Sequence, residues 1–161
     1  MHHLIVNATV PAEGHNFMAE VFKHMNLTSI QLLRKLNLKL QFTPGAGPGD
    51  PLMGLPQGLA RMPVRSSLEE ICINILICVS GEWSAQIQHW GPLDEVLGDQ
   101  KRFPRLERIQ ILVSAASNST FVEVDERIGD WLVMLFIQSM PGECFSTMRK
   151  IYGANFTFQA G

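Results

Sequence analysis

The chain has few cysteines, little charge and no long apolar run. Its three cysteines, an odd count without paired spacing, argue against a disulfide framework and favour free thiols in a reducing compartment. Charged residues make up 17% of the sequence, the formal net charge is −2, and the lysines and arginines are scattered. The basic footprint of a protein that binds nucleic acid or anionic lipid is therefore missing. The longest apolar run, WLVMLFI at 131–137, is far too short to cross a bilayer. We expect neither nucleic acid nor a membrane as a partner.

The first residues also lack the pattern of a secretory leader, which is a cationic segment followed by a long apolar one. We therefore predict an intracellular protein, cytoplasmic or nuclear. Four Asn-x-Ser/Thr triplets begin at Asn7, Asn26, Asn118 and Asn155. Such triplets mark glycosylation sites in secreted proteins. Without a leader, we interpret these four as chance matches.

The chain does contain a repeated apolar spacing. Residues 33–42, LRKLNLKLQF, place leucine at positions 33, 36, 38 and 40, which is one step of three followed by two steps of two. The same spacing returns in LEEICINILI at 68–77 and in LERIQILV at 106–113. A step of two is the period of a β-strand, and the step of three before it indicates a turn that leads into the strand.

Other segments predict helices and loops between these strands. The further expected elements are a strand at 4–10, helices at 16–27, 92–99 and 125–140, and a last strand in the tail. Residues 43–58 contain nine Gly or Pro among sixteen, so we predict a loop without regular structure there. The tail repeats the spacing weakly, through Met148, Ile151, Phe156 and Phe158.

The order of these elements predicts the fold class. With 46% apolar residues, the chain fits a single domain, 1–161, that can bury a sizeable core. Strands joined by long crossovers usually pair in parallel. The repeated spacing recurs after 35 residues, from 36 to 71, and after 38 residues, from 71 to 109. We predict an α/β stack of βα units in which Leu36, Leu38 and Leu40 layer on Ile71, Ile73 and Ile75, and these on Ile109, Ile111 and Val113.

The spacing L-x-x-L-x-L-x-L resembles the strand portion of a leucine-rich repeat. The longer segments SLEEICINI and WGPLDEVLGDQKRFPRLERIQI resemble the irregular, leucine-rich-repeat-like C-terminal region of fungal F-box-type proteins, over about residues 30–115. The resemblance implies a leucine-rich-repeat-like stack with a mostly parallel sheet. In that family the F-box binds a ubiquitin-ligase adaptor and the repeat region contacts the substrate. The helical F-box is not present before the repeats, so only the repeat region is carried over to this chain.

Residues between the apolar positions of each strand would face outward, on the concave side of such a sheet. This outward stripe is the candidate surface for a protein partner. Its members are Asn37, Lys39 and Gln41, then Cys72, Asn74 and Leu76, then Gln110, Leu112 and Ser114, extended by Asn7 and Thr9 if the first strand joins the sheet. The alternative is a solvated sheet face without a partner.

Motifs that carry chemistry are missing. The segment GAGPGD lacks the lysine and the hydroxyl residue of a phosphate-binding loop, and no His or Cys pair has zinc-finger spacing. The remaining catalytic candidates are Cys144 with a distant histidine, and His89 beside Asp94 and Glu95. We expect no enzyme activity, no cofactor and no metal.

These observations lead to one prediction and two alternatives. The prediction is a non-catalytic protein–protein interaction module that resembles the substrate-recognition region of F-box-type proteins. The first alternative is a fragment of a longer protein, without independent function, that self-associates through uncapped repeat ends. The second is a small intracellular cysteine-dependent enzyme.

Overall fold

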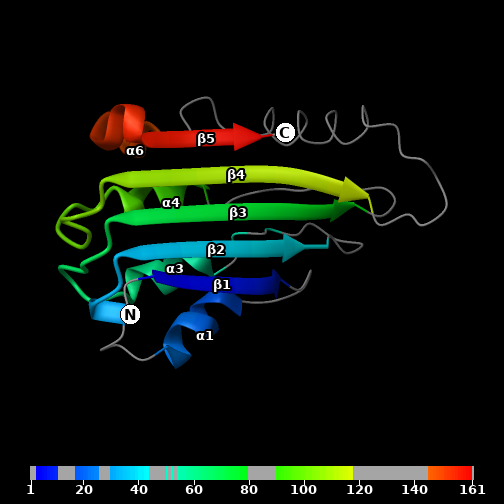
Figure 1. Ribbon diagram of the computed structural model, residues 1–161, viewed down its shortest axis with the longest axis horizontal. Coiled ribbons are helices and arrows are strands. Elements are labelled where there is room, and N and C mark those ends of the chain that lie inside the picture. The colour runs from blue at the N-terminus through cyan, green and yellow to red at the C-terminus, as the bar shows by residue number, and fades with distance from the viewer. Residues whose placement is uncertain are drawn as a thin grey trace.

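The computed structural model describes residues 3–10, 17–25, 30–43, 50, 52, 54–79, 90–117 and 145–160. These residues form a five-stranded sheet in which every pair of neighbours is parallel and the strand order follows the chain (Figure 1). The strands are β1 (His3–Val10), β2 (Lys35–Phe42), β3 (Glu70–Val79), β4 (Arg108–Ser117) and β5 (Phe156–Ala160). The predicted α/β class with a parallel sheet is confirmed.

The helices form a second layer behind the sheet in the view of Figure 1. They are α1 (Phe17–His24), α3 (Leu55–Ala60), α4 (Trp90–Leu97) and α6 (Ser146–Tyr152), and a 3₁₀ turn at Gly153–Asn155 leads into β5. Neighbouring helices touch in chain order, α1 with α3, α3 with α4, and α4 with α6. The fold is therefore a stack of βα units in which each unit packs on the one before it.

The repeated apolar spacing forms the core between these two layers. Leu36 lies beside Ile71, which lies beside Ile109, and the next two apolar positions of each strand pair in the same way. All nine of these side chains are at most 2% exposed. Burial of one such side chain stabilises the fold by about 1.5–3 kcal/mol, so the layering predicted from the sequence accounts for much of the hydrophobic stabilisation.

The step of three also has a structural role. Leu33, Leu68 and Leu106 stand three residues before the first core position of their strands, and all three are buried. Between them and the strands the chain turns, and the carbonyl of Arg34 accepts hydrogen bonds from the backbone N–H groups of Glu69 and Glu70. The carbonyl of Glu69 accepts in the same way from the next unit. The predicted turn is thus repeated, and its backbone groups join successive units.

The prediction for residues 43–58 is wrong at its C-terminal end, where α3 begins at Leu55. Pro56 occupies the first turn of α3, where a missing N–H costs nothing. Gly54 precedes the helix with a φ of 78°, a conformation that favours glycine. Gly58 lies where a Cβ atom would come within 2.5 Å of the Phe22 ring on α1. Gly54, Pro56 and Gly58 therefore fit the start and the packing of a short helix.

The tail is also organised differently from the prediction. Its last strand is confirmed as β5, but Met148 and Ile151 lie in α6 and not in an approach to that strand. A step of three fits one face of a helix as well as a turn, and this explains the error. The short helix predicted at 92–99 is confirmed as α4, and it buries Leu93 and Leu97. The helix predicted at 125–140 lies outside the described residues.

Trp90 begins α4 and holds the last unit to the stack. Its ring is buried and meets Phe145 and Phe158 edge to face, with centroid separations of 5.0 and 6.0 Å. Such aromatic pairs add about 0.5–1.5 kcal/mol beyond the burial of their area. Trp90 is therefore a core residue and not an exposed anchor for a partner, whereas Trp83 lies outside the described residues.

Candidate functional site

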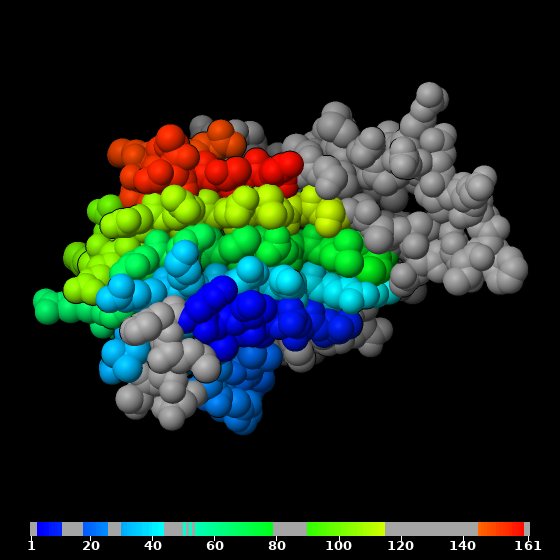
Figure 2. Space-filling model, in the orientation of Figure 1, coloured from blue at the N-terminus to red at the C-terminus, as the bar shows by residue number. Residues whose placement is uncertain are grey.

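The side of the sheet opposite the helices carries the outward residues of all five strands, and we call it the open face. Figure 2 views the molecule from this side, where the strands run as parallel bands from blue to red. The parallel register aligns the outward residues in rows that cross the strands. The Lys39 row contains Asn7, Lys39, Asn74, Leu112 and Gln159. The Gln41 row contains Thr9, Gln41, Leu76 and Ser114. The Asn37 row contains Ile5, Asn37, Cys72, Gln110 and Thr157.

A hollow of about 540 Å³ lies on the open face and reaches all five strands. Its outward lining residues are the members of the Lys39 row and the Gln41 row. Eight residues of the predicted stripe therefore lie together in one concavity: Asn7, Thr9, Lys39, Gln41, Asn74, Leu76, Leu112 and Ser114. The hollow is open to solvent, which suits a bound chain segment better than an enclosed small molecule.

Three residues of the predicted stripe, Asn37, Cys72 and Gln110, lie outside the hollow. They belong to the Asn37 row, one row closer to the starts of the strands. Gln159 of β5 lines the hollow but was not predicted as a site residue. The signal for Gln159 was available, since it follows Phe158 in the alternation of the tail.

Side-chain hydrogen bonds join the Asn37 row to the hollow. The amide nitrogen of Asn74 donates to Oδ1 of Asn37 at 3.1 Å and also contacts Sγ of Cys72 at 3.4 Å. The thiol of Cys72 is 3.6 Å from Oε1 of Gln110. On the other side, Nε2 of Gln41 lies 3.3 Å from Sγ of Cys78. These contacts link side chains across β2, β3 and β4, and they restrict the rotamers that a partner would meet.

The charge of the open face is uneven along the strands. At the strand starts, Lys35 forms an ion pair with Glu70, with Nζ 2.9 Å from Oε2, and this hydrogen bond to Lys35 lowers the pKa of the Glu70 carboxyl. Lys39 lies four residues further along the same strand and is exposed. In the described part of the chain, no carboxylate lies within ion-pair distance of Lys39. The hollow therefore contains a cation that has no counter-ion among the described residues.

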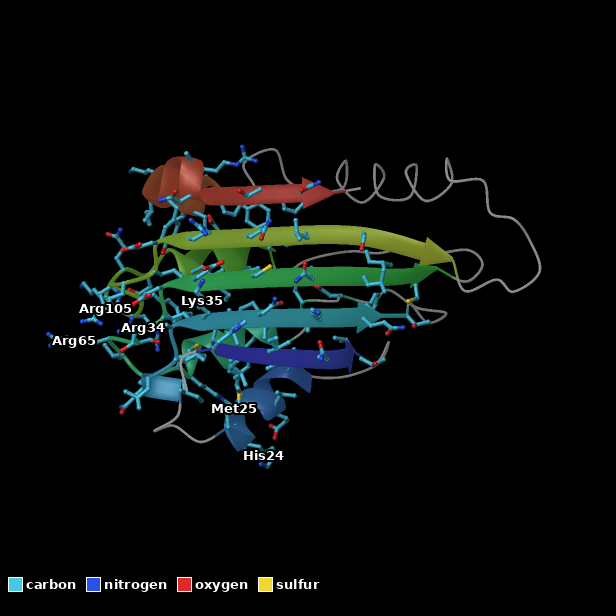
Figure 3. All side chains as sticks on the ribbon, viewed as in Figure 1. His24, Met25, Arg34, Lys35, Arg65 and Arg105 are labelled. Atoms are coloured by element: carbon cyan, nitrogen blue, oxygen red, sulfur yellow. The ribbon has the colours of Figure 1, made fainter. Side chains whose placement is uncertain are left out.

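A second hollow, of about 280 Å³, lies where the strands begin. Cations that are scattered in the sequence gather at this end of the sheet, where Figure 3 labels Arg34, Lys35, Arg65 and Arg105. Acidic side chains are interspersed among them, and Arg34 pairs with Glu69 at 3.5 Å. The lining of this hollow holds three glutamates, an arginine, a lysine and an asparagine. Its charges largely neutralise one another, so it is the weaker candidate for a site.

The described cysteines do not have the environment of a nucleophile. Partial burial raises the pKa of the Cys72 thiol, and the hydrogen bond from Asn74 only partly opposes this effect. At neutral pH the group is therefore a thiol and not the thiolate that nucleophilic catalysis requires. Cys78 is buried and, six residues further along β3, lies on the same side of the strand as Cys72. The other catalytic candidates, Cys144 and His89, lie outside the described residues.

Neither a metal site nor a membrane-spanning helix is found in the part of the chain that the structure describes. Within the ranges given above, no group of three or more His, Cys, Asp and Glu side chains is arranged to hold a metal ion. No helix in those ranges is both long enough and apolar enough to cross a membrane.

Comparison with family models, with curated proteins and with solved structures finds no match.

Proposed function

We propose that this chain is a non-catalytic binding module that holds a segment of a protein partner on its open face. The observation that carries the proposal is the hollow, which crosses all five strands and is lined by eight residues of the predicted stripe. Concave faces of stacked βα units serve as extended binding surfaces in repeat proteins. The resemblance to the repeat region of F-box-type proteins supports the same role, with the partner in the position of a substrate.

The energetics of the sheet also favour binding on this side. The core between sheet and helices is complete in the middle strands, so the open face is not needed to bury apolar surface. A partner would meet a rigid platform whose backbone is fixed by parallel pairing. Rigid platforms lose little conformational entropy on binding, which leaves more of the contact energy for affinity.

The proposal is tested by reversing the charge of the hollow from positive to negative. The double variant Lys39→Glu/Asn74→Glu should lose a partner that the wild type captures, while its circular dichroism stays unchanged, and the single variant Lys39→Glu, which breaks no described hydrogen bond, should weaken the same capture. The matched control is Lys150→Glu/Gln57→Glu, which makes the same change of charge at exposed helical positions. Capture that survives in the first variant, or that is lost equally in the control, would show that the hollow is not the binding surface.

A further inference from the structure

The proposed function does not specify the chemistry of the partner. The residues of the hollow indicate which class of peptide sequence it can bind. We infer that the hollow binds an extended peptide segment in which an acidic side chain and a large apolar side chain stand two positions apart. This inference depends on the proposed function and adds to it the class of sequence that is recognised.

The acidic side chain follows from Lys39. The described lining of the hollow contains one charged group, the Lys39 ammonium, and no carboxylate. The neighbouring cation, Lys35, is already paired with Glu70 at 2.9 Å. A carboxylate on the partner would therefore meet a single cation that has no described internal competitor. Amides and hydroxyls surround that cation, and these groups can share the remaining lone pairs of a carboxylate.

The apolar side chain follows from Leu76 and Leu112. Leu76 is 36% exposed, and Leu112, which is half-buried, lies diagonally across from it on the next strand. Leu76 is paired with Gln41, so it lies diagonally across from Lys39 on the next strand. Diagonal neighbours are about 7–8 Å apart. Together these two leucines offer a small apolar surface next to the cation.

The spacing of two matches that geometry. In an extended segment, side chains two positions apart point to the same side and are separated by about 6.6–6.8 Å. A carboxylate placed over Lys39 therefore places the side chain two positions away over Leu76. The intervening residue faces solvent, so its identity is free. Amide side chains on either side of this diagonal, Gln41 and Asn74, can hydrogen-bond the backbone of the segment.

The charge of the hollow discriminates between a peptide and a nucleic acid. A nucleic acid is a poorer fit because its binding depends on several cations, each neutralising one phosphate, and the described lining supplies one. A short acidic–apolar peptide satisfies both the single charge and the apolar surface.

The test uses four fluorescein-labelled peptides and fluorescence anisotropy, with protein concentrations up to about 1 mM. The parent peptide is GSESLSGS, and the variants are GSQSLSGS, GSKSLSGS and GSESSSGS. We expect the parent to bind about fivefold more tightly than the Gln peptide, as for one exposed ion pair, and more tightly still than the Lys peptide. Replacement of Leu by Ser in the peptide should weaken binding by a similar factor.

Protein variants connect these effects to the residues named. Lys39→Glu should reverse the order, so that the Lys peptide binds better than the parent, and Lys39→Gln should abolish the preference without adding a charge. Leu76→Ser should weaken the parent peptide but leave GSESSSGS unchanged. Circular dichroism of each variant confirms that the fold is retained.

The outcomes separate this inference from the proposed function. Equal binding of all four peptides, or no binding at the highest concentration, overturns the acidic–apolar inference. If Lys39→Glu/Asn74→Glu still abolishes capture of a protein partner in that case, the open face remains the binding surface and only the sequence class is wrong. If capture is also unaffected, both proposals are wrong.

Discussion

Replacement of Asp94 should weaken the fold more than replacement of any surface acid. Asp94 lies on α4, is 7% exposed, and accepts hydrogen bonds from the backbone N–H groups of Thr147 and Met148 at 2.9 and 2.8 Å. These donors belong to the first turn of α6. The residue at the N-cap position of α6 is Phe145, whose apolar side chain cannot accept a hydrogen bond. A carboxylate from another helix therefore caps α6 and ties the last βα unit to the stack.

The size of the effect follows from these two bonds. A hydrogen bond to a charged group contributes about 1.5–3 kcal/mol, and an unsatisfied buried donor costs a similar amount. Loss of an N-cap typically costs about 1 kcal/mol, and here the cap is buried. We expect Asp94→Ala to lower the free energy of unfolding by about 3 kcal/mol. For a domain of this size, that corresponds to a melting temperature roughly 6–12 °C lower.

Urea denaturation followed by tryptophan fluorescence measures this change, with the slope of the transition checked for constancy. The control is Glu95→Ala, which removes the adjacent, exposed acid from the same helix and should change stability by less than about 0.5 kcal/mol. Hydrogen exchange at Thr147 and Met148 should accelerate in Asp94→Ala and not in the control. Equal stability of the two variants would refute the capping role.

Three further predictions concern other parts of the stack. Tyr152, the single tyrosine, donates to the Leu97 carbonyl at 2.6 Å, and burial together with the charge of Asp99 raises its pKa from 10.0 to about 12. Folding therefore favours the neutral phenol. Its contribution to the free energy of unfolding is complete below pH 10 and is lost as the pH rises towards 12. A midpoint near pH 10 for the phenol in absorbance titrations of the folded protein would contradict this prediction. Gly58→Ala should lower the free energy of unfolding by about 1–3 kcal/mol, because the added Cβ would meet the Phe22 ring. The control Gly91→Ala, which has open space around its Cβ, should be neutral or slightly stabilising. Similar melting temperatures for the two variants would contradict the contact with Phe22. Apart from the buried Val10, the core-facing side chains of the outermost described strands are only partly buried, so we expect self-association that Val6→Lys suppresses. Light scattering that finds a monodisperse monomer for the wild type would refute this prediction.

The strands and their register were predictable from the sequence because one side of the sheet is fully buried. A shift of one residue would place Leu36, Leu38 and Leu40 on the solvent side, so burial permits a single alignment with the next strand. Alignment of the three repeated spacings therefore gives the observed pairing of Leu36 with Ile71 and of Ile71 with Ile109. The composition of each strand carries this information locally.

The short helices were not predictable in the same way, because their stability comes from contacts distant in the sequence. The cap of α6 is supplied by Asp94, 53 residues before Thr147. The glycine at 58 permits close contact with Phe22 on α1, although it weakens the local helix signal. Isolated helices of six to eight residues are marginal in water, so tertiary contacts determine whether they form.

The candidate site was likewise predictable only in part. That Lys39, Asn74 and Leu112 share a row follows from aligning the strands, and the sequence predicted this. The same alignment places Lys35 beside Glu70 and Lys39 between two asparagines. The sequence therefore already indicates that Lys35 is paired with a carboxylate on the neighbouring strand and that Lys39 is not. The position of the hollow depends on the three-dimensional shape of the sheet, and no local pattern marks Asn37 as outside it.

The separation of the two faces makes the binding hypothesis testable without loss of the fold. The energy that holds the stack together comes from the apolar side, where Leu38, Ile73 and Ile111 are fully buried. Surface substitutions away from such features usually change stability by less than about 0.5 kcal/mol. Several side chains of the open face bond one another, and Asn74 bonds both Asn37 and Cys72, so a variant at Asn74 alters the platform as well as the surface. Lys39 makes no such described contact, and a change in partner affinity on its replacement therefore reports recognition alone.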